Sequence, residues 1–137
     1  MAASESVTPL LSAGGDNVAP WMSAVLASVD AMDTPRFLSF LTEDAAFRFA
    51  NAPAAAGREA VGAMVSGFFA SIKACRHEIR NAWAPPGHAV CQGLVTYTRH
   101  DGGLLTLPFV NVFVMRQGRI ADYQIYIDAT PLYAPPQ

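Results

Sequence analysis

The sequence predicts an α+β fold in which helices from the first half of the chain pack on a mostly antiparallel sheet from the second half. Up to residue 72, three segments space their apolar residues as the faces of amphipathic helices do, with one short strand at 47–51. Beyond residue 72, apolar and polar residues alternate with the period of strands. Turn residues separate these strands, and Asp101-Gly102 is the strongest hairpin signal among them.

Each expected helix has its own signal. The first covers about residues 18–31, where apolar residues such as Trp21 and Val25 share one side. The second starts at Thr34-Pro35, with Thr34 as N-cap and Pro35 in the first helical position, and ends near residues 43–44. The third follows a turn after Asn51 and carries an apolar stripe from residue 61 to residue 72.

The expected strands of the second half are 77–83, 88–99, 104–115 and 120–128. A sheet of this kind, curled around an amphipathic helix, encloses a conical space. Segment 104–115 is apolar on both faces, so its outer face needs a cover as well. We expect a second copy of the chain to provide it, giving a homodimer. The alternative is an N-terminal tail that folds back over the sheet.

Composition narrows the function classes. Hydrophobic residues make up 52% of the 137 residues and charged residues 15%, so apolar side chains must be hidden in a pocket, an interface or both. A net charge of -2 without a basic run argues against nucleic-acid binding. Cys75 and Cys91 are expected to be core thiols rather than a disulfide, and neither has zinc-site spacing.

The chain is expected to be one domain, residues 17–134, after a flexible tail at residues 1–16 that is rich in small and polar residues. No segment is long enough to span a bilayer, and no signal-peptide pattern opens the sequence, so a cytoplasmic location without membrane contact is expected. The sequence contains no phosphate loop, nucleotide fingerprint or metal-ligand cluster, so neither cofactor nor metal is expected.

Strand alternation predicts which side chains face the cone. An apolar pocket with a few convergent polar groups is the usual form of a small-molecule site. Amides suit a ligand that carries oxygen, because they both donate and accept hydrogen bonds. The predicted ligand-binding residues are Asn51, Gln92, Asn111, Phe49, Phe109 and Tyr123.

Two residues are candidates for catalysis. His77 is predicted to face the cone, and imidazole is the side chain that changes charge near neutral pH. It would act as general base or acid; the alternative is a core histidine that only bonds a neighbour. Asp128 is the second candidate, if the last strand bulges to bring it to the pocket mouth; the alternative is a turn cap before Pro131.

The order of elements and five segments carry a family resemblance: FRFANAPAAAGREAV, HEIRNAW, LVTYTRHDGG, VFVMRQGRI and YIDATPL. Together they resemble the SnoaL-like and ketosteroid-isomerase-like branch of the nuclear transport factor 2-like superfamily over about residues 18–133. The resemblance implies a cone-shaped α+β barrel of cystatin-like type, usually dimeric, with a deep pocket. Isomerases, dehydratases (which are lyases), polyketide cyclases and epoxide hydrolases use this pocket, as do non-catalytic proteins.

The local pattern also resembles limonene epoxide hydrolase, in which a Tyr-x-Asn segment and an Asp–Arg–Asp network activate water. Its Asn falls on Asn51, but its Tyr falls on Phe49, and its charged residues fall on Gln92, Leu94 and Ile125. Epoxide hydrolysis needs a base and an acid, which these side chains do not supply. We therefore expect cofactor-independent acid/base chemistry of isomerase, dehydratase or cyclase type on a small, apolar, oxygen-bearing molecule. The alternatives are a carrier of such a molecule, an altered epoxide hydrolase, and an interaction domain whose cone is filled by its own side chains.

Overall fold

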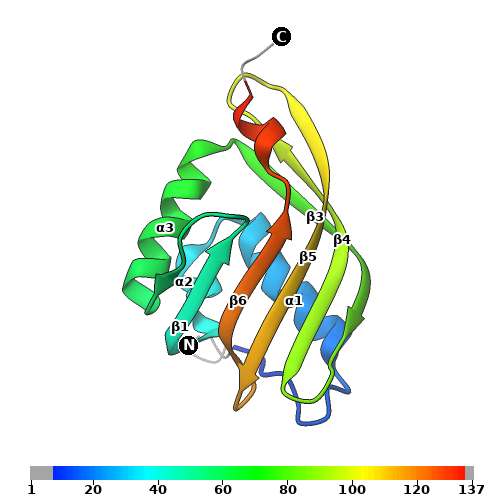
Figure 1. Ribbon diagram of the computed structural model, residues 1–137. Coiled ribbons are helices and arrows are strands. Elements are labelled where there is room, and N and C mark those ends of the chain that lie inside the picture. The colour runs from blue at the N-terminus through cyan, green and yellow to red at the C-terminus, as the bar shows by residue number, and fades with distance from the viewer. Residues whose placement is uncertain (1–7, 135–137) are drawn as a thin grey trace, which may run out of the picture.

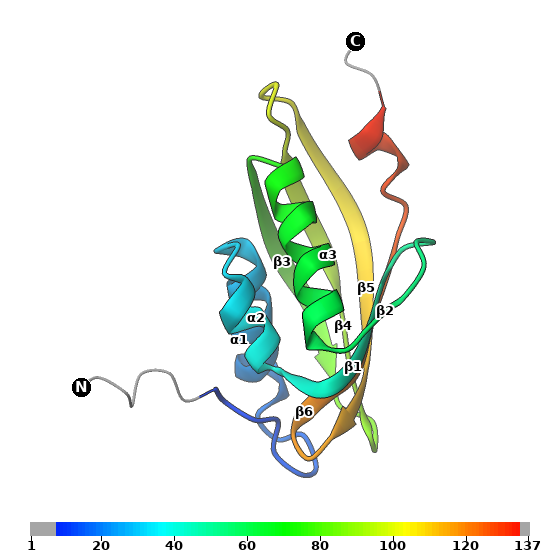
Figure 2. The ribbon, with the colours of Figure 1, turned by 90° about the vertical axis from the view of Figure 1, so that its left-hand side faces the viewer.

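The computed structural model describes residues 8–134 and confirms the predicted α+β class. Its helices lie together on one face of a single sheet, which Figures 1 and 2 show from two directions. The sheet is curved but remains open, so the expected barrel is not closed. The elements are α1 (Val18–Asp30), α2 (Thr34–Ser39), β1 (Leu41–Phe49), β2 (Ala55–Ala56), α3 (Arg58–Ser71), β3 (Ala74–Trp83), β4 (His88–Thr98), β5 (Leu104–Arg116), β6 (Arg119–Ile127) and a 3₁₀ helix (Thr130–Tyr133).

The sheet has six strands in the order β2-β1-β6-β5-β4-β3. All neighbouring pairs are antiparallel except β1 and β6, which run parallel. The short strand β2 and the long strand β3 form the two edges. The hairpins β3–β4, β4–β5 and β5–β6 follow the predicted turns, because each predicted strand pairs with the next one along the chain.

The second helix and the first strand differ from the sequence prediction. Asp33, not Thr34, is the N-cap of α2, because its carboxylate accepts a hydrogen bond from the backbone N–H of Arg36 at 3.1 Å. The helix ends at Ser39, and residues 41–44 begin β1 rather than finishing the helix. Leu41 is fully buried and pairs with Ile120 of β6, so sheet pairing overrides the helical spacing there.

Aromatic packing holds α1 and α2 to the sheet. Trp21 on α1 meets Phe40 and Phe113 edge-on, with ring centroids 6.4 and 6.0 Å apart. Both cysteines are free and buried, as predicted. Cys75 on β3 lies beneath the end of α1, where the thiol approaches the Val29 carbonyl at 3.6 Å. This packing brings the C-terminus of α1 against the inner face of β3, which is where the candidate site forms.

The segment before α1 contacts the sheet in its described part. Leu11 is buried, and its backbone N–H donates to the Gly118 carbonyl in the β5–β6 turn at 3.1 Å. The expected flexible tail covers residues 1–16, of which residues 1–7 lie outside the described residues. None of the helices within residues 8–134 is long and apolar enough to cross a membrane.

Candidate functional site

A cavity of about 320 Å³ lies between α3 and the inner face of the sheet. Figure 2 shows α3 along this side of the sheet, with the 3₁₀ helix near the far end of β6. The aromatic part of the lining includes Phe37, Phe47, Phe49, Phe68, Phe69 and Phe109. The polar part comprises Ser71, His77, Tyr97, Asn111, Tyr123 and Tyr133, and the described lining holds no Lys, Arg, Asp or Glu. The cavity therefore suits a neutral, largely apolar molecule.

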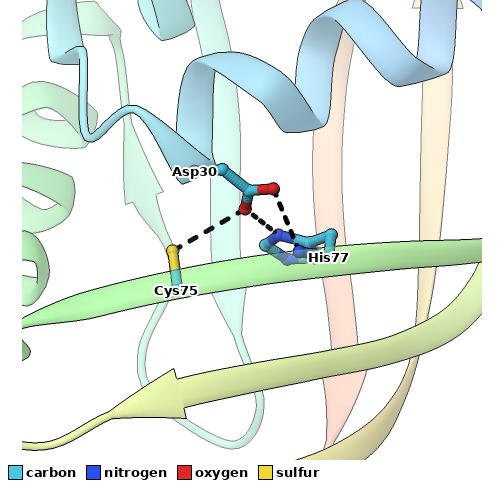
Figure 3. Close-up of side chains that lie close together, drawn as sticks. All are labelled: Asp30, Cys75 and His77. Carbon is cyan, nitrogen blue, oxygen red and sulfur yellow. Dashed lines mark hydrogen bonds and ion pairs between the residues drawn. The ribbon is translucent and has the colours of Figure 1, made fainter.

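His77, which lines this cavity, is paired with Asp30 (Figure 3). Nδ1 of His77 lies 2.6 Å from Oδ1 of Asp30, and the His77 backbone N–H donates to Oδ2 at 3.0 Å. The two hydrogen bonds fix the carboxylate of Asp30, the last residue of α1, against β3. The His77 ring meets Phe109 edge-on at a centroid distance of 5.2 Å. Because a carboxylate accepts hydrogen bonds, Nδ1 is the donor of this pair and Nε2 is the ring nitrogen left for a ligand.

Cys75 is the third member of this cluster. It precedes His77 by two residues on the same face of β3, and its thiol approaches Oδ1 of Asp30 at 3.8 Å. Burial, with a smaller contribution from the Asp30 charge, raises the pKa of this thiol to about 12. The thiol therefore stays protonated near neutral pH and points its weak donor at the carboxylate.

The carboxylate, thiol and imidazole are donors of the kinds that a divalent cation takes, and their ligating atoms lie within 4.8 Å of one another. Two ligands at about 2.0 Å on a tetrahedral zinc ion stand about 3.3 Å apart. The 2.6 Å between His77 Nδ1 and Asp30 Oδ1 is shorter than this distance between zinc ligands. It is the length of a short hydrogen bond. We therefore interpret the cluster as a hydrogen-bonded proton-transfer group.

Asn111 and Tyr123 form the polar part of the deep end of the cavity. Asn111 is 1% exposed, and its Oδ1 atom is enclosed without a hydrogen-bond partner among the described residues. Tyr123 packs on Phe113 with ring centroids 4.3 Å apart. Burial raises the pKa of Tyr123 well above its usual value, so the side chain stays a neutral phenol.

The predicted positions divide into two groups. The structure brings His77, Phe49, Phe109, Asn111 and Tyr123 together around the cavity, as their strand positions predicted. Their chemical roles stay predictions. Gln92, Asn51 and Asp128 lie elsewhere.

Gln92 is on the opposite face of the sheet from the cavity, so the predicted facing of β4 is wrong. It is exposed, and its Oε1 accepts a hydrogen bond from Asn81 at 2.7 Å. The residues of β4 that line the cavity are Val95 and Tyr97. A register shift after Ile79 places Asn81 on the outer face, although it is four residues from His77 on the same strand.

Asn51 and Asp128 both lie outside the cavity lining of the described chain. Asn51 is exposed in the turn after β1, although the next residue, Ala52, does reach the cavity. Asp128 accepts a hydrogen bond from the Thr130 backbone N–H at 3.1 Å, which is the turn cap named as its alternative. Hydrogen bonding from Thr130 also lowers the pKa of Asp128. This exposed carboxylate therefore opens the 3₁₀ helix and does not reach the pocket mouth.

Sequence reasoning missed Asp30 and Tyr97. Asp30 resembles a helix cap in the sequence, but it closes α1, where a carboxylate opposes the helix dipole. An acid in that unfavourable position signals a partner elsewhere, here His77. Tyr97 was missed because the wrong face of β4 was assigned to the cavity.

Solved structures of the same fold have low sequence identity to this chain, so their likeness concerns the fold alone. A putative SnoaL-like polyketide cyclase from Jannaschia sp. CCS1 is 16% identical, covers 88% of this chain and 96% of its own, and has a TM-score of 0.71. TerC, co-crystallised with polyporic acid, is 18% identical, with 82% and 92% covered and a TM-score of 0.74. A limonene-epoxide-hydrolase-like enzyme from M. tuberculosis is 14% identical, with 79% and 80% covered and a TM-score of 0.68.

No curated protein matches the sequence. A family model matches directly: residues 22–123, which include most of α1, strands β1 to β5 and most of the polar lining, fit the SnoaL-like domain. The fold of the solved neighbours agrees with this match. The chain belongs to the SnoaL-like domain family.

Proposed function

We propose that the protein binds a small, apolar, oxygen-bearing organic molecule in the cavity and performs acid/base chemistry on it without a cofactor. The reaction would be an isomerisation, a dehydration or a cyclisation. One observation carries this proposal: an imidazole that is hydrogen-bonded to a carboxylate at 2.6 Å stands at the wall of an apolar cavity.

The geometry suggests how protons would move. Nε2 of His77 removes a proton from a carbon beside a carbonyl group, and the electron pair of the C–H bond moves onto the carbonyl oxygen. Asp30 stabilises the imidazolium that forms, because its carboxylate already accepts from Nδ1–H. The imidazolium then returns the proton to another carbon in an isomerisation, or to a departing hydroxyl in a dehydration. Asn111 and Tyr123 orient the oxygen-bearing part of the molecule.

The comparisons support this class without identifying a substrate. One structural neighbour is described as a putative polyketide cyclase, another was crystallised with polyporic acid, and a third is called an epoxide hydrolase. The epoxide hydrolase alternative has the weakest support, because Gln92 lies on the outer face and the described lining holds no carboxylate. That same lack of a lining carboxylate favours a carrier as the second candidate.

We also propose that the protein is a homodimer through the outer face of the sheet. Side chains on this face include the half-buried Val110 and Val112, Val114 at 41% exposure and Tyr126 at 54%. Such neighbouring apolar side chains are typical of a protein interface. The two free thiols suit a reducing compartment, which supports the cytoplasm as the proposed location.

A general proton-transfer probe tests the proposed chemistry without knowledge of the natural substrate. In 5-nitrobenzisoxazole a base removes the ring C–H proton, the N–O bond breaks, and a coloured cyano-nitrophenolate is released. We expect the wild type to accelerate this elimination above the rate with free imidazole. His77→Gln should lower kcat/KM about 100-fold, the usual size of a general-base effect. His88→Gln removes an exposed turn histidine and is the matched control, expected to retain the wild-type rate.

The same pair of variants separates an enzyme from a carrier. An enzyme working through His77 accelerates the elimination and loses that acceleration in His77→Gln. A carrier binds the probe without accelerating its elimination at any pH. Equal rates for His77→Gln and the wild type would overturn the assignment of His77 as the base.

A further inference from the structure

Removal of a proton by His77 leaves negative charge on the ligand, and the cavity must stabilise that charge. The described lining holds no Lys or Arg, and the nearest fixed charge is the carboxylate of Asp30 behind the imidazole. In an apolar cavity an unpaired anion is costly. Besides the imidazolium that forms on His77, neutral hydrogen-bond donors are the groups that can stabilise this charge.

Tyr97 is a hydrogen-bond donor on the strand paired with the one that carries His77. In the β3–β4 pair, Val95 lies opposite His77 and Tyr97 lies opposite Cys75. Tyr97 is therefore the diagonal neighbour of His77 on the inner face, a relationship in which long aromatic side chains reach the same space. Both residues line the cavity.

The Tyr97 ring is held in place while its hydroxyl stays unpaired. The residue is 3% exposed, and its ring meets Phe68 of α3 edge-on at a centroid distance of 5.7 Å. Its hydroxyl makes no hydrogen bond within residues 8–134. Within that range, the polar side-chain atoms that are both fully enclosed and without a hydrogen-bond partner belong to Trp21, Arg58 and Asn111. The Tyr97 hydroxyl is not one of them, so it is not fully enclosed. Because Tyr97 lines the cavity, an unpaired hydroxyl on this buried ring is placed to meet a ligand there.

We propose that the Tyr97 hydroxyl donates a hydrogen bond to the ligand oxygen that gains negative charge when His77 removes a proton. This inference rests on the proposed function for the identity of the base, and it adds a second catalytic residue on the neighbouring strand. The proton stays on Tyr97 throughout, so the residue stabilises the oxyanion and does not transfer a proton. Burial supports this role, because it holds the pKa of Tyr97 well above its usual value.

Tyr123 is the competing phenol and is less suited to the role. Its ring lies in a deep aromatic cluster with Phe37, Phe47 and Phe113, at centroid distances of 5.3, 5.1 and 4.3 Å. It belongs to β6, two strands away from β4. Tyr97 instead lies beside β3, which carries the base. A ligand between α3 and the sheet would therefore present one edge to His77 and its oxygen to Tyr97.

A matched pair of small ligands tests this role without any reaction. We would measure the Kd of 4-nitrophenolate, which carries an oxyanion, and of 4-nitroanisole, which has the same ring but no charge. Tyr97→Phe should weaken 4-nitrophenolate binding about tenfold, the effect of losing one hydrogen bond to a charged group. The Kd of 4-nitroanisole should stay within about twofold, because the ring is retained. Tyr126→Phe, on the outer face, should change neither Kd.

Each other outcome counts against the proposal. Equal losses for both ligands would assign Tyr97 to packing alone, and no loss for either would remove it from the site. A selective loss in Tyr123→Phe but not in Tyr97→Phe would assign the role to Tyr123. Repeating the measurement in a His77→Gln background separates the two proposals. A tenfold effect of Tyr97 that persists there stands even if the elimination assay fails to implicate His77.

Discussion

Asp30 accepts two hydrogen bonds from His77, one from Nδ1 of the imidazole and one from the backbone N–H. A carboxylate that accepts from Nδ1–H selects one tautomer and presents Nε2 as the basic atom. The pair joins the end of α1 to β3, so the register between this helix and the sheet edge sets the position of the base.

Asp30→Asn should therefore lower kcat/KM for 5-nitrobenzisoxazole about 100-fold, with little change in KM. The amide can donate to Nδ1 and so favours the wrong tautomer, and it no longer stabilises the imidazolium. The measurement is a pair of steady-state kinetic profiles. Asp33→Asn is a matched control three residues away, where the carboxylate only caps α2. An Asp30→Asn enzyme as fast as Asp33→Asn would show that His77 works without its carboxylate.

Gly93 sits where β3 and β4 approach too closely for a side chain. A Cβ there would lie 1.9 Å from the Glu78 carbonyl oxygen, next to the register shift of β3. Gly93→Ala should cost about 2 kcal/mol or more of folding free energy, because backbone atoms must move. Urea unfolding measures this cost. Gly67→Ala on the exposed face of α3 meets no atom within 4 Å and should instead stabilise the protein by up to about 1 kcal/mol.

The two buried thiols predict a loss of stability in alkali. Burial raises the pKa of Cys75 and of Cys91 to about 12, from 9.0. Above pH 9 the unfolded chain releases these protons while the folded chain keeps them, so the free energy of unfolding falls as pH rises towards 12. Each thiol contributes up to about 1.4 kcal/mol per pH unit.

Urea unfolding between pH 9 and 10 measures this dependence, to which the buried Tyr97 and Tyr123 contribute equally with and without the thiols. We expect the slope to be shallower in a Cys75→Ala/Cys91→Ala variant than in the wild type. The comparison uses slopes rather than absolute stabilities, because alanine also leaves a cavity at each site. Identical slopes would mean that the thiols do not titrate differently in the folded and unfolded chains.

The proposed dimer predicts that a charge at the centre of the outer sheet face separates the subunits. Val112→Glu places a carboxylate on β5 opposite Gln124 of β6. Sedimentation velocity should then show a monomer where the wild type sediments as a dimer. Leu104→Glu, at the exposed start of the same strand, is the control and should leave the dimer intact. A monomeric wild type would contradict the proposed dimer directly.

The order of elements followed from the sequence because period and turn chemistry are local. The facing of β4 did not, because its outer face places the large apolar Leu94 beside the polar Gln92, whereas its inner face carries small residues such as Gly93. The facing of β5 was predicted because Phe109 and Phe113 mark one face with large aromatic rings. Alternation therefore predicts facing only where the two faces differ in size or polarity.

Only some residues of the candidate site were predicted, for a similar reason. His77 and Asn111 sit on strands whose facing was correct, so both reach the cavity. Asp30 is 47 residues from its partner, and no local pattern connects a helix end to a strand so far along the chain. Asn51 and Asp128 act locally or face solvent, as turn residues often do. Whether a polar residue joins the site depends on its contacts with residues far along the chain rather than on its residue type.

The central claim is that Asp30 keeps the proton on Nδ1 of His77 and leaves Nε2 as a base facing the cavity. The ¹⁵N NMR shifts of the His77 ring, measured at a pH where the imidazole is neutral, test it most directly. We predict a protonated Nδ1 and an unprotonated Nε2 in the wild type, with a change of tautomer in Asp30→Asn. A wild-type ring that carries its proton on Nε2 would contradict the account.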